Sequence, residues 1–306
     1  MRETCEFRID GNFVDKLFDK HEGKVLGDNF IRLIEIDVTD PRYVEIGRLQ
    51  KEMIKKTGKP FFFGWHINRY YSDEELSSAA LLHLKITSFI NSAGEDCGTT
   101  YDESKACNAK QRRYELKTRV NPRRIITQEV VESCGAGAVQ SSELQLELNK
   151  IPKKNDISRT IAGEIVVSAR LADLLKKEMV SGVSFGPVYS CHNKNKLANN
   201  FLQLFPNKCD IEIIPPSKFG TGPFDDDKEG RYRCDKCNVL GLVQLSELWV
   251  KEEMMTGLEI RASRQFSGVR RGLLRPERAI FISPQLWRLL EINGIKGYEI
   301  EVVHFR

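Results

Sequence analysis

The chain contains an internal repeat, and this repeat constrains the fold more than any other feature of the sequence. Residues 167–188 recur without a gap as residues 282–303, at a constant offset of 115 residues. Six positions carry the same residue in both copies: Ser168/Ser283, Leu171/Leu286, Leu174/Leu289, Leu175/Leu290, Gly182/Gly297 and Val188/Val303. We therefore expect one supersecondary unit to occur twice, and much of the chain to be scaffold.

Each copy has the residue order of a strand, a capped helix, a glycine and a second strand. Ser168 and Ser283 stand where a helix N-cap belongs, and Pro284 suits a first helical position because its missing N–H is not needed there. The repeated leucines recur at i, i+3 and i+4, which predicts one apolar stripe on each helix. Gly182 and Gly297 stand just beyond the helices, where positive φ is common.

This pattern predicts an α+β fold with two related lobes, built on a duplicated strand–helix–strand unit. The two copies of the unit are expected over about residues 156–188 and 259–303, within a region of residues 141–306. Residues 1–140 are expected to form an N-terminal α+β region, which ends in a Cys-rich and polar module at residues 91–140.

Local patterns predict helices and strands in the N-terminal region, among them a buried strand over Phe61–Trp65. The apolar run Phe30–Ile36 predicts a strand, and the spacing of apolar residues predicts an amphipathic helix over Tyr43–Lys56, although Gly47 interrupts it. Ser72 and the glutamate three residues later form a capping box, which predicts a helix from about Asp73 to Ile90.

Composition narrows the class of protein. The 306 residues carry a net charge of only +4, which is a weak argument for a nucleic-acid partner. The start of the sequence lacks the apolar stretch of a signal peptide, and no segment is apolar enough to span a bilayer. We therefore expect a cytoplasmic protein without a membrane partner. Its eight cysteines are then expected to be thiols or metal ligands and not disulfides.

One pair of cysteines has the spacing of a zinc knuckle. Cys234 and Cys237, in a knuckle at residues 231–240, can direct two thiolates at one tetrahedral Zn²⁺, but a second pair is needed. The candidates for that pair are Cys97, Cys107 and Cys134, with Cys191, His192 and Cys209 as less favoured positions. Three interpretations stay open at this point: a structural zinc that staples the Cys-rich module, unligated thiols, or a redox pair.

Several segments together resemble the double-CxxCG family of bacterial proteins. They are Gly94-Glu-Asp-Cys97-Gly-Thr-Thr-Tyr101-Asp-Glu-Ser104-Lys-Ala-Cys107, Ser133-Cys134-Gly-Ala-Gly137, Asp156-Ile157 with Thr160, Glu164-Ile-Val-Val-Ser168, and Gly268-Val-Arg-Arg-Gly272-Leu-Leu-Arg-Pro276 followed by Ile282-Ser283. The resemblance covers about three quarters of the chain. Members of that family are similar to immunity proteins, which neutralise toxins exchanged between neighbouring bacteria. The resemblance therefore implies a cytoplasmic, non-enzymatic protein that binds a cognate toxin.

The chain departs from the family pattern at both cysteine motifs. Cys107 and Cys134 are separated by 26 residues, as if a basic segment had been inserted, and Asn238 stands where the second motif would have glycine. With these departures, the resemblance implies Cys107, Cys134, Cys234 and Cys237 as the zinc ligands, with Cys97 as the alternative.

Other motifs carry little functional weight. Gly182-Val-Ser184-Phe-Gly186 matches the string around a serine-hydrolase nucleophile, but here it follows a helix and enters a strand, and Glu299 replaces Ser184 in the second copy. No nucleotide-binding motif is present, and we assign no catalytic or cofactor-binding residue. The triplet that ends at Asp227 is expected to be an exposed acidic loop.

Two Arg-rich stretches keep an alternative function open. They are Arg112, Arg113, Lys117, Arg119, Arg123 and Arg124, and Arg261, Arg264, Arg270, Arg271, Arg275 and Arg278. Such clusters can neutralise phosphates, so the alternative is a zinc-ribbon-containing protein that binds nucleic acid. They can equally face an acidic protein surface, or form solvated basic faces.

Overall fold

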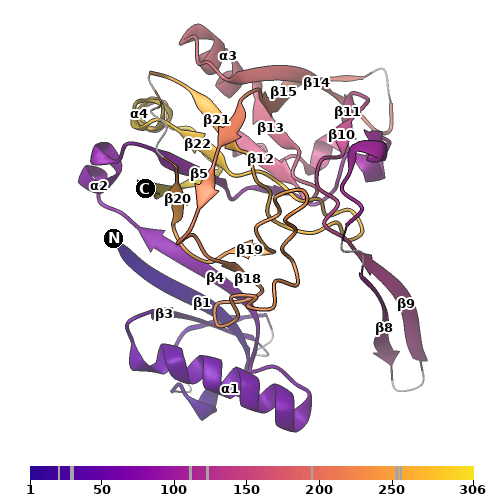
Figure 1. Ribbon diagram of the computed structural model, residues 1–306, viewed down its shortest axis with the longest axis vertical. Helices are drawn as coiled ribbons and strands as arrows, with labels where there is room; N and C mark the ends of the chain where they lie inside the picture. The colour runs from indigo at the N-terminus through magenta and orange to yellow at the C-terminus, as the bar shows by residue number, and fades with distance from the viewer. Residues whose placement is uncertain are drawn as a thin grey trace. The chain divides into compact units, whose positions relative to one another are not determined.

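The computed structural model describes residues 1–19, 21–27, 31–109, 112–121, 124–193, 196–251, 255 and 257–306. The chain contains both helices and many strands, as the sequence predicts (Figure 1). It divides into two compact units: Met1–Leu76 with Thr221–Asp226, and Ser77–Gly220 with Asp227–Arg306. The boundary expected at residue 140 falls inside the second unit.

The first unit is a four-stranded antiparallel sheet with one long helix. Its strands are β1 (Arg2–Asp10), β2 (Lys24–Leu26), β3 (Ile31–Asp37) and β4 (Phe62–Tyr70), in the sheet order β2-β3-β1-β4, and a 3-10 turn η1 lies at Val14–Lys16. The strand predicted over Phe30–Ile36 corresponds to β3, while Phe30 itself lies outside the described residues. The helix α1 spans Pro41–Thr57, which confirms the predicted helix, and Asp40 caps it.

Gly47 lies inside α1 because an aromatic ring takes the place of a side chain there. A Cβ on Gly47 would come within 2.7 Å of the Phe224 ring. That ring also packs against Phe7 and Tyr43, at centroid distances of 6.0 Å and 4.8 Å. Close packing of the apolar core therefore offsets the cost of a glycine within a helix, which is about 1 kcal/mol.

The helix predicted over Asp73–Ile90 is wrong beyond its first turns. The capping box is present, since the Ser72 N–H donates to the Glu75 carboxylate over 2.8 Å and the Glu75 N–H donates back to the Ser72 hydroxyl over 3.2 Å. However, α2 spans only Asp73–Ser78, and the apolar residues that follow form the strand β5 (Leu82–Ile86). Strand pairing on both sides of β5 overrides the helical pattern of its sequence.

The second unit contains two larger sheets. The six-stranded sheet consists, in sheet order, of β11 (Leu144–Leu146), β14 (Val183–Ser190), β15 (Leu197–Pro206), β13 (Ile165–Ser168), β12 (Ile157–Thr160) and β6 (Phe89–Ile90). The seven-stranded sheet consists of β16 (Cys209–Ile211), β21 (Ile260–Ser263), β22 (Ile280–Ile282), β5, β23 (Tyr298–Phe305), β20 (Leu248–Val250) and β17 (Ile213–Ile214).

These two sheets repeat one pattern of neighbours. In the first, the pairs β11–β14 and β12–β6 are parallel and the three pairs between them are antiparallel. In the second, β20–β23 and β16–β21 are parallel and the three pairs between them are again antiparallel. The central strand of the two patterns comes from a different place in the sequence. In the first sheet it is β15, which follows the first repeat copy, and in the second it is β5, which precedes both copies.

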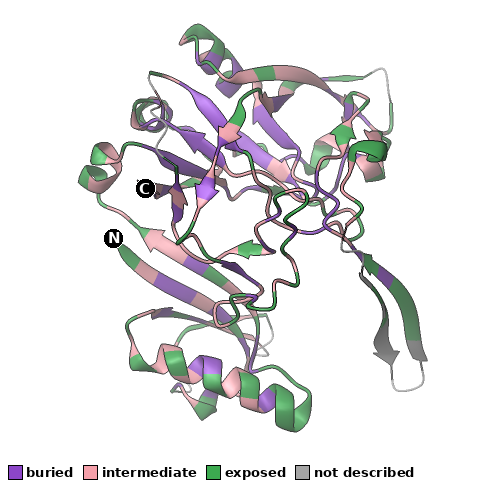
Figure 2. Ribbon diagram, viewed as in Figure 1, coloured by how far each residue is buried: buried purple, intermediate pink, exposed green. Residues whose placement is uncertain are grey.

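Both repeat copies form a strand, a helix and a strand. The first is β13, α3 (Ala169–Lys177) and β14, and the second is β22, α4 (Pro284–Ile292) and β23. Ser168 and Ser283 are the N-caps, and each hydroxyl accepts the N–H of the residue three positions on, over 3.1 Å. Figure 2 shows β13 and β22 as buried strands of the second unit.

The glycine after each helix makes a close contact with the other copy. A Cβ on Gly182 would lie 2.0 Å from the carbonyl oxygen of Ile260, in β21. A Cβ on Gly297 would lie 2.1 Å from the carbonyl oxygen of Ile157, in β12. Both glycines also have positive φ, of 82° and 112°. The two repeat copies therefore contact each other through equivalent positions.

Short elements complete the second unit. They are the strand pairs β7 (Tyr101–Asp102) with β10 (Val139–Gln140), β8 (Arg112–Asn121) with β9 (Arg124–Glu132) and β18 (Phe219–Gly220) with β19 (Val243–Gln244), and the 3-10 turns η2 (Glu95–Cys97), η3 (Glu103–Lys105) and η4 (Leu148–Lys150). Among the described residues, no helix has the length and apolar character needed to cross a membrane.

Candidate metal centre

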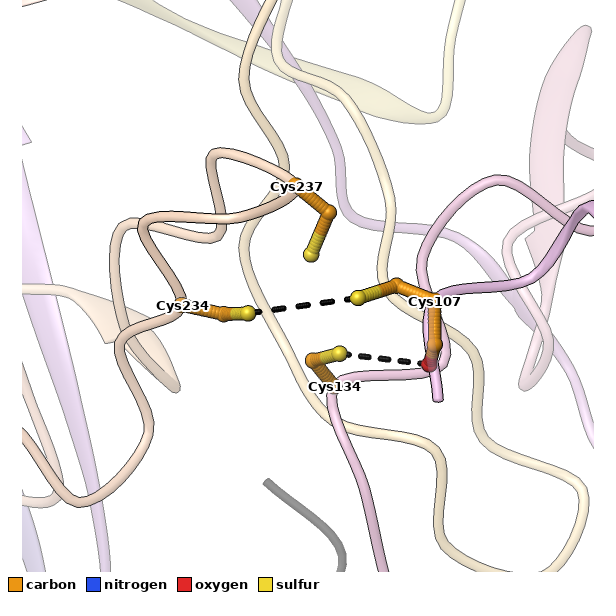
Figure 3. Close-up of side chains that lie close together, drawn as sticks. All are labelled: Cys107, Cys134, Cys234 and Cys237. Carbon is orange, nitrogen blue, oxygen red and sulfur yellow. Dashed lines mark hydrogen bonds between the residues drawn. The ribbon is translucent and has the colours of Figure 1, made fainter. Parts of the chain in front are cut away.

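Four cysteines from distant segments of the second unit lie together (Figure 3). The sulfur atoms of Cys107, Cys134, Cys234 and Cys237 are all within 4.8 Å of one another. The Cys107 and Cys234 sulfurs are 4.0 Å apart, although 127 positions separate them in the sequence. All four cysteines are free thiols, and Cys134 and Cys234 are buried.

Cys234 and Cys237 lie on a tight hairpin. Cys234 and Val239 exchange backbone hydrogen bonds of 2.9 and 3.1 Å, so the intervening residues form the turn that directs both sulfurs to one side. Asn238 has a φ of 59°, in the left-handed region. Asparagine tolerates this conformation better than most residues, so it suits the turn that closes the hairpin.

A buried carboxylate supports the approach to this hairpin. Asp227 is only 2% exposed, and its two oxygens accept the N–H groups of Arg231 over 2.8 Å and Tyr232 over 2.9 Å. The expectation of an exposed acidic loop is therefore wrong for Asp227, although Asp225 and Asp226 are exposed. Consecutive aspartates point in different directions, and the third one organises the backbone before the knuckle.

The other two sulfurs come from segments that contact each other directly. The Cys107 N–H donates to the carbonyl of Ala136 over 2.7 Å, and the Cys134 thiol lies 3.3 Å from the carbonyl oxygen of Cys107. Gly135 has a φ of 53°, and a Cβ there would lie 2.2 Å from the Cβ of Arg270. Only glycine fits after Cys134, since both the conformation and the space exclude a side chain.

The segment Phe266–Arg270 joins these cysteine-bearing segments through its backbone. Phe266 accepts the Leu240 N–H over 2.9 Å, next to the knuckle. Arg270 exchanges backbone hydrogen bonds with Ser133, beside Cys134, and its N–H donates over 2.9 Å. The segment Phe266–Arg270 therefore helps to hold the cysteine-bearing segments together.

A group of paired charges involves Arg270, at the end of this segment, and Arg275. The Arg270 guanidinium is 3.0 Å from the Glu95 carboxylate, and Arg275 bonds Glu95 over 3.0 Å and Glu103 over 2.6 Å. The Arg275 side chain is only 7% exposed and lies 3.9 Å from the centre of the Tyr101 ring. Burial acts to lower the pKa of Arg275, but the bonds to Glu103 and Glu95 raise it above its ordinary value.

Three of the four clustered thiols have shifted pKa values. Burial acts to raise the pKa of the Cys107 thiol, but hydrogen bonds from Cys134 and from neighbouring groups lower it to about 7. Burial and the bond to Cys107 raise the pKa of Cys134 to about 11, and burial raises that of Cys237 further. The Cys107 thiolate therefore forms readily, whereas Cys134 and Cys237 resist ionisation, mainly because they are buried and in addition because they lie beside other thiols.

The donor set fits a tetrahedral thiolate metal. With a Zn–S distance of about 2.3 Å, the sulfurs of a tetrahedral site are roughly 3.8 Å apart. The sulfurs here need to move by at most about 1 Å to reach that geometry, because all of them lie within 4.8 Å. Four protein ligands leave no open coordination position, so such a site is structural and not catalytic.

Cys97, the alternative ligand, lies outside this group of four. Its side chain is within hydrogen-bonding reach of Cys191, and burial together with that thiol raises the pKa of Cys97 to about 11. Cys209 is exposed. Ser184 lies in β14, as expected, and its hydroxyl donates to the Asn207 side chain over 2.8 Å.

The second Arg-rich stretch is engaged within the protein. Arg261 pairs with Asp210, Arg264 with Glu212, Arg270 with Glu95, Arg271 with Glu132 and Arg275 with Glu103, while Arg278 donates to the backbone carbonyls of Ser263 and Arg264. In the first stretch only the Arg113 side chain is described, and it is exposed; Arg123 lies outside the described residues. The second stretch therefore offers little free positive charge to phosphates.

No protein-family model matches the chain, and no curated protein matches it either.

Proposed function

We propose that Cys107, Cys134, Cys234 and Cys237 bind one structural zinc ion. The observation that carries this proposal is the convergence of four sulfurs from three separate segments within 4.8 Å. Thiolates favour zinc over magnesium or calcium, and a zinc ion would neutralise the crowded negative charge. The four cysteines would then join the knuckle to both ends of the β8–β9 hairpin.

The protein itself acts, in this proposal, as a cytoplasmic bacterial binding protein that neutralises a cognate toxin. Two arguments support it. The motifs resemble the double-CxxCG family, and the ligand set that this resemblance implies consists of the same four cysteines that lie together. A closed site without an open position also suits a scaffold that presents a binding surface better than it suits an enzyme.

The scaffold is proposed to have arisen by duplication of one strand–helix–strand unit. The common order of parallel and antiparallel neighbours in the two large sheets supports this origin. So do the reciprocal contacts of Gly182 with Ile260 and of Gly297 with Ile157. A duplicated unit explains why the repeated leucines serve core packing, which leaves function to the segments outside the repeat.

Co-expression with the toxin encoded beside its gene tests the neutralisation. We expect the wild-type chain to restore growth and to co-purify with the toxin. Cys237→Ser should weaken the rescue, since it removes a ligand, whereas Cys209→Ser should keep it because Cys209 lies outside the cluster. Absence of both rescue and complex formation for the wild type would remove the proposal.

A further inference from the structure

Two further cysteines lie close together outside the four-cysteine cluster. Cys97 ends the 3-10 turn η2, and Cys191 directly follows the strand β14. The two residues are far apart in the sequence, but the Cys97 thiol lies within hydrogen-bonding reach of the Cys191 thiol. Both cysteines are free and partly exposed. The fold therefore brings together two thiols that solvent can reach.

Hydrogen bonds to β11 place both cysteines beside the same short strand. The Cys191 N–H donates to the carbonyl of Leu146, the last residue of β11, over 3.0 Å. On the other side, the side-chain amide of Gln145 donates over 3.2 Å to the carbonyl of Gly98, the residue after Cys97. The backbone on both sides therefore holds the two thiols near each other.

The second repeat copy has no thiol at the position of Cys191. At the constant offset of the repeat, Arg306 corresponds to Cys191. The backbone contact is the same in both copies, because the Arg306 N–H donates over 3.2 Å to the carbonyl of Val250, the last residue of β20. The strand end therefore packs in the same way without a sulfur.

Cys97 also has a counterpart without a thiol. The Thr99 hydroxyl accepts a backbone N–H of β11 over 2.9 Å, and the Ser217 hydroxyl accepts a backbone N–H of β20 over 2.8 Å. Pro215 precedes Ser217 by two positions, as Cys97 precedes Thr99. The packing of the repeat therefore does not require a sulfur at either position.

The pair offers too few ligands for a metal ion. Among the residues that the structure describes, His, Cys, Asp and Glu side chains bring three or more ligand atoms together only at the four-cysteine cluster. Cys97 and Cys191 thus supply two sulfurs without a third ligand, whereas a tetrahedral zinc site needs at least three from the protein. Two neighbouring thiols without a metal are suited to disulfide formation.

We propose that Cys97 and Cys191 form a redox-sensitive site, at which a peroxide closes a reversible disulfide. The Cys191 thiolate attacks one oxygen of the peroxide, the O–O bond breaks, and Cys191 becomes a sulfenic acid while a water molecule leaves. The Cys97 thiol then attacks the Cys191 sulfur, the S–S bond forms, and the hydroxyl leaves as a second water molecule. The two sulfurs lose two electrons, which reduce one hydrogen peroxide, and both thiol protons leave in the water.

The surroundings of the two sulfurs assign their order of reaction. Burial, together with the neighbouring Cys191 thiol, raises the pKa of Cys97 to about 11, so Cys97 keeps its proton at neutral pH. The thiolate is the nucleophile in this chemistry, so Cys191 reacts first and Cys97 closes the disulfide. This chemistry is independent of the proposed zinc and toxin binding, since neither cysteine belongs to the cluster.

Mass spectrometry of the full chain after oxidation tests the site. The protein is treated with hydrogen peroxide, with or without dimedone to trap a sulfenic acid, then denatured, alkylated with N-ethylmaleimide and digested. The wild type is compared with Cys97→Ser and Cys191→Ser. The control is Cys209→Ser, which removes an exposed cysteine outside the pair. Circular dichroism shows whether each chain has folded.

We expect the wild type and Cys209→Ser to yield a peptide that joins Cys97 to Cys191, and to lose it on treatment with dithiothreitol. Cys97→Ser should lack this peptide and carry a dimedone adduct on Cys191, while Cys191→Ser should keep Cys97 as an alkylated thiol. A wild type that keeps all eight thiols after peroxide treatment, or that forms its disulfide between other cysteines, would overturn the inference. The wild-type result alone decides this, even if a variant fails to fold.

Discussion

The thiol of Cys134 lies 3.3 Å from the carbonyl oxygen of Cys107, although 27 positions separate the two residues in the sequence. The 26 residues between them contain both strands of the β8–β9 hairpin. Closing the hairpin therefore brings Cys107 and Cys134 together.

Removal of one proposed ligand should affect both metal content and stability. Cys237→Ser is expected to lose the bound zinc and to lower the free energy of unfolding by roughly 4 kcal/mol, which is typical of a lost metal site. Cys209→Ser is the control, because Cys209 is exposed and outside the cluster. Guanidinium unfolding with parallel metal analysis measures both quantities. Equal stability and metal content in the two variants would contradict the ligand assignment.

Gly297→Ala should destabilise the contact between the two repeat copies. A methyl group there would meet the Ile157 carbonyl oxygen at 2.1 Å, and the φ of 112° disfavours any side chain. We expect a loss of about 3 kcal/mol or more. Gly294→Ala is a close match, since Gly294 also has positive φ but has no atom within 4 Å of the added Cβ. It should cost only about 1 kcal/mol, as measured by thermal or denaturant unfolding.

The Asp156 carboxylate should make the free energy of unfolding depend on pH in the acid range. Burial acts to raise the pKa of this carboxyl, but the hydrogen bond from Arg170 and those from Ser168 and the Lys296 N–H lower it below its ordinary value. A lowered folded-state pKa gives stability that is complete above the unfolded value of about 3.9 and is lost as pH falls through the folded value. Asp156→Asn should therefore cost about 2 kcal/mol at pH 7.

The pH profile of the same pair of proteins provides the check. The difference in unfolding free energy between wild type and Asp156→Asn should be constant from pH 7 to about 5 and shrink below about pH 4. A difference that stays constant to pH 2 would show that the carboxylate charge contributes nothing.

Arg275→Met should lower the free energy of unfolding because it removes ion pairs beside the cysteine cluster, while all four cysteines stay in place. Arg275 is 7% exposed, and its removal leaves Glu95 and Glu103 without one of their partners. Because the Glu95 and Glu103 carboxylates are 36% and 48% exposed, solvent screens these pairs, and the expected loss is about 1 kcal/mol. Arg288→Met, at an exposed position, should cost less than about 0.5 kcal/mol. Denaturant unfolding compares the two variants, and similar losses would contradict a structural role for the Arg275 pairs.

Local patterns in the sequence predicted the repeat units well. The capping serines, the leucine stripe and the terminal glycines all act within one helix and its neighbours, so Ser168 and Ser283 could be assigned as N-caps from sequence alone. The helix predicted over Asp73–Ile90 was wrong because β5 is held by strands near residues 280 and 300, and no local pattern reports such pairing.

The cysteine cluster was predictable only in part. The knuckle spacing identified Cys234 and Cys237, and the resemblance supplied Cys107 and Cys134. Spacing could not exclude Cys97, because its separation from the cluster depends on how η2 packs against β11. The roles of Asp227, Arg270 and Arg275 were missed because each contacts groups whose proximity arises only in the folded chain.

The metal content of untagged protein is the decisive test of the zinc site. We expect about one zinc ion per chain, since four thiolates close a single site. The four clustered cysteines should resist a thiol reagent in the native protein until a chelator removes the zinc, while exposed Cys209 should react at once. Substoichiometric metal, together with free reaction of Cys107, Cys134, Cys234 and Cys237 in the native state, would contradict the zinc site.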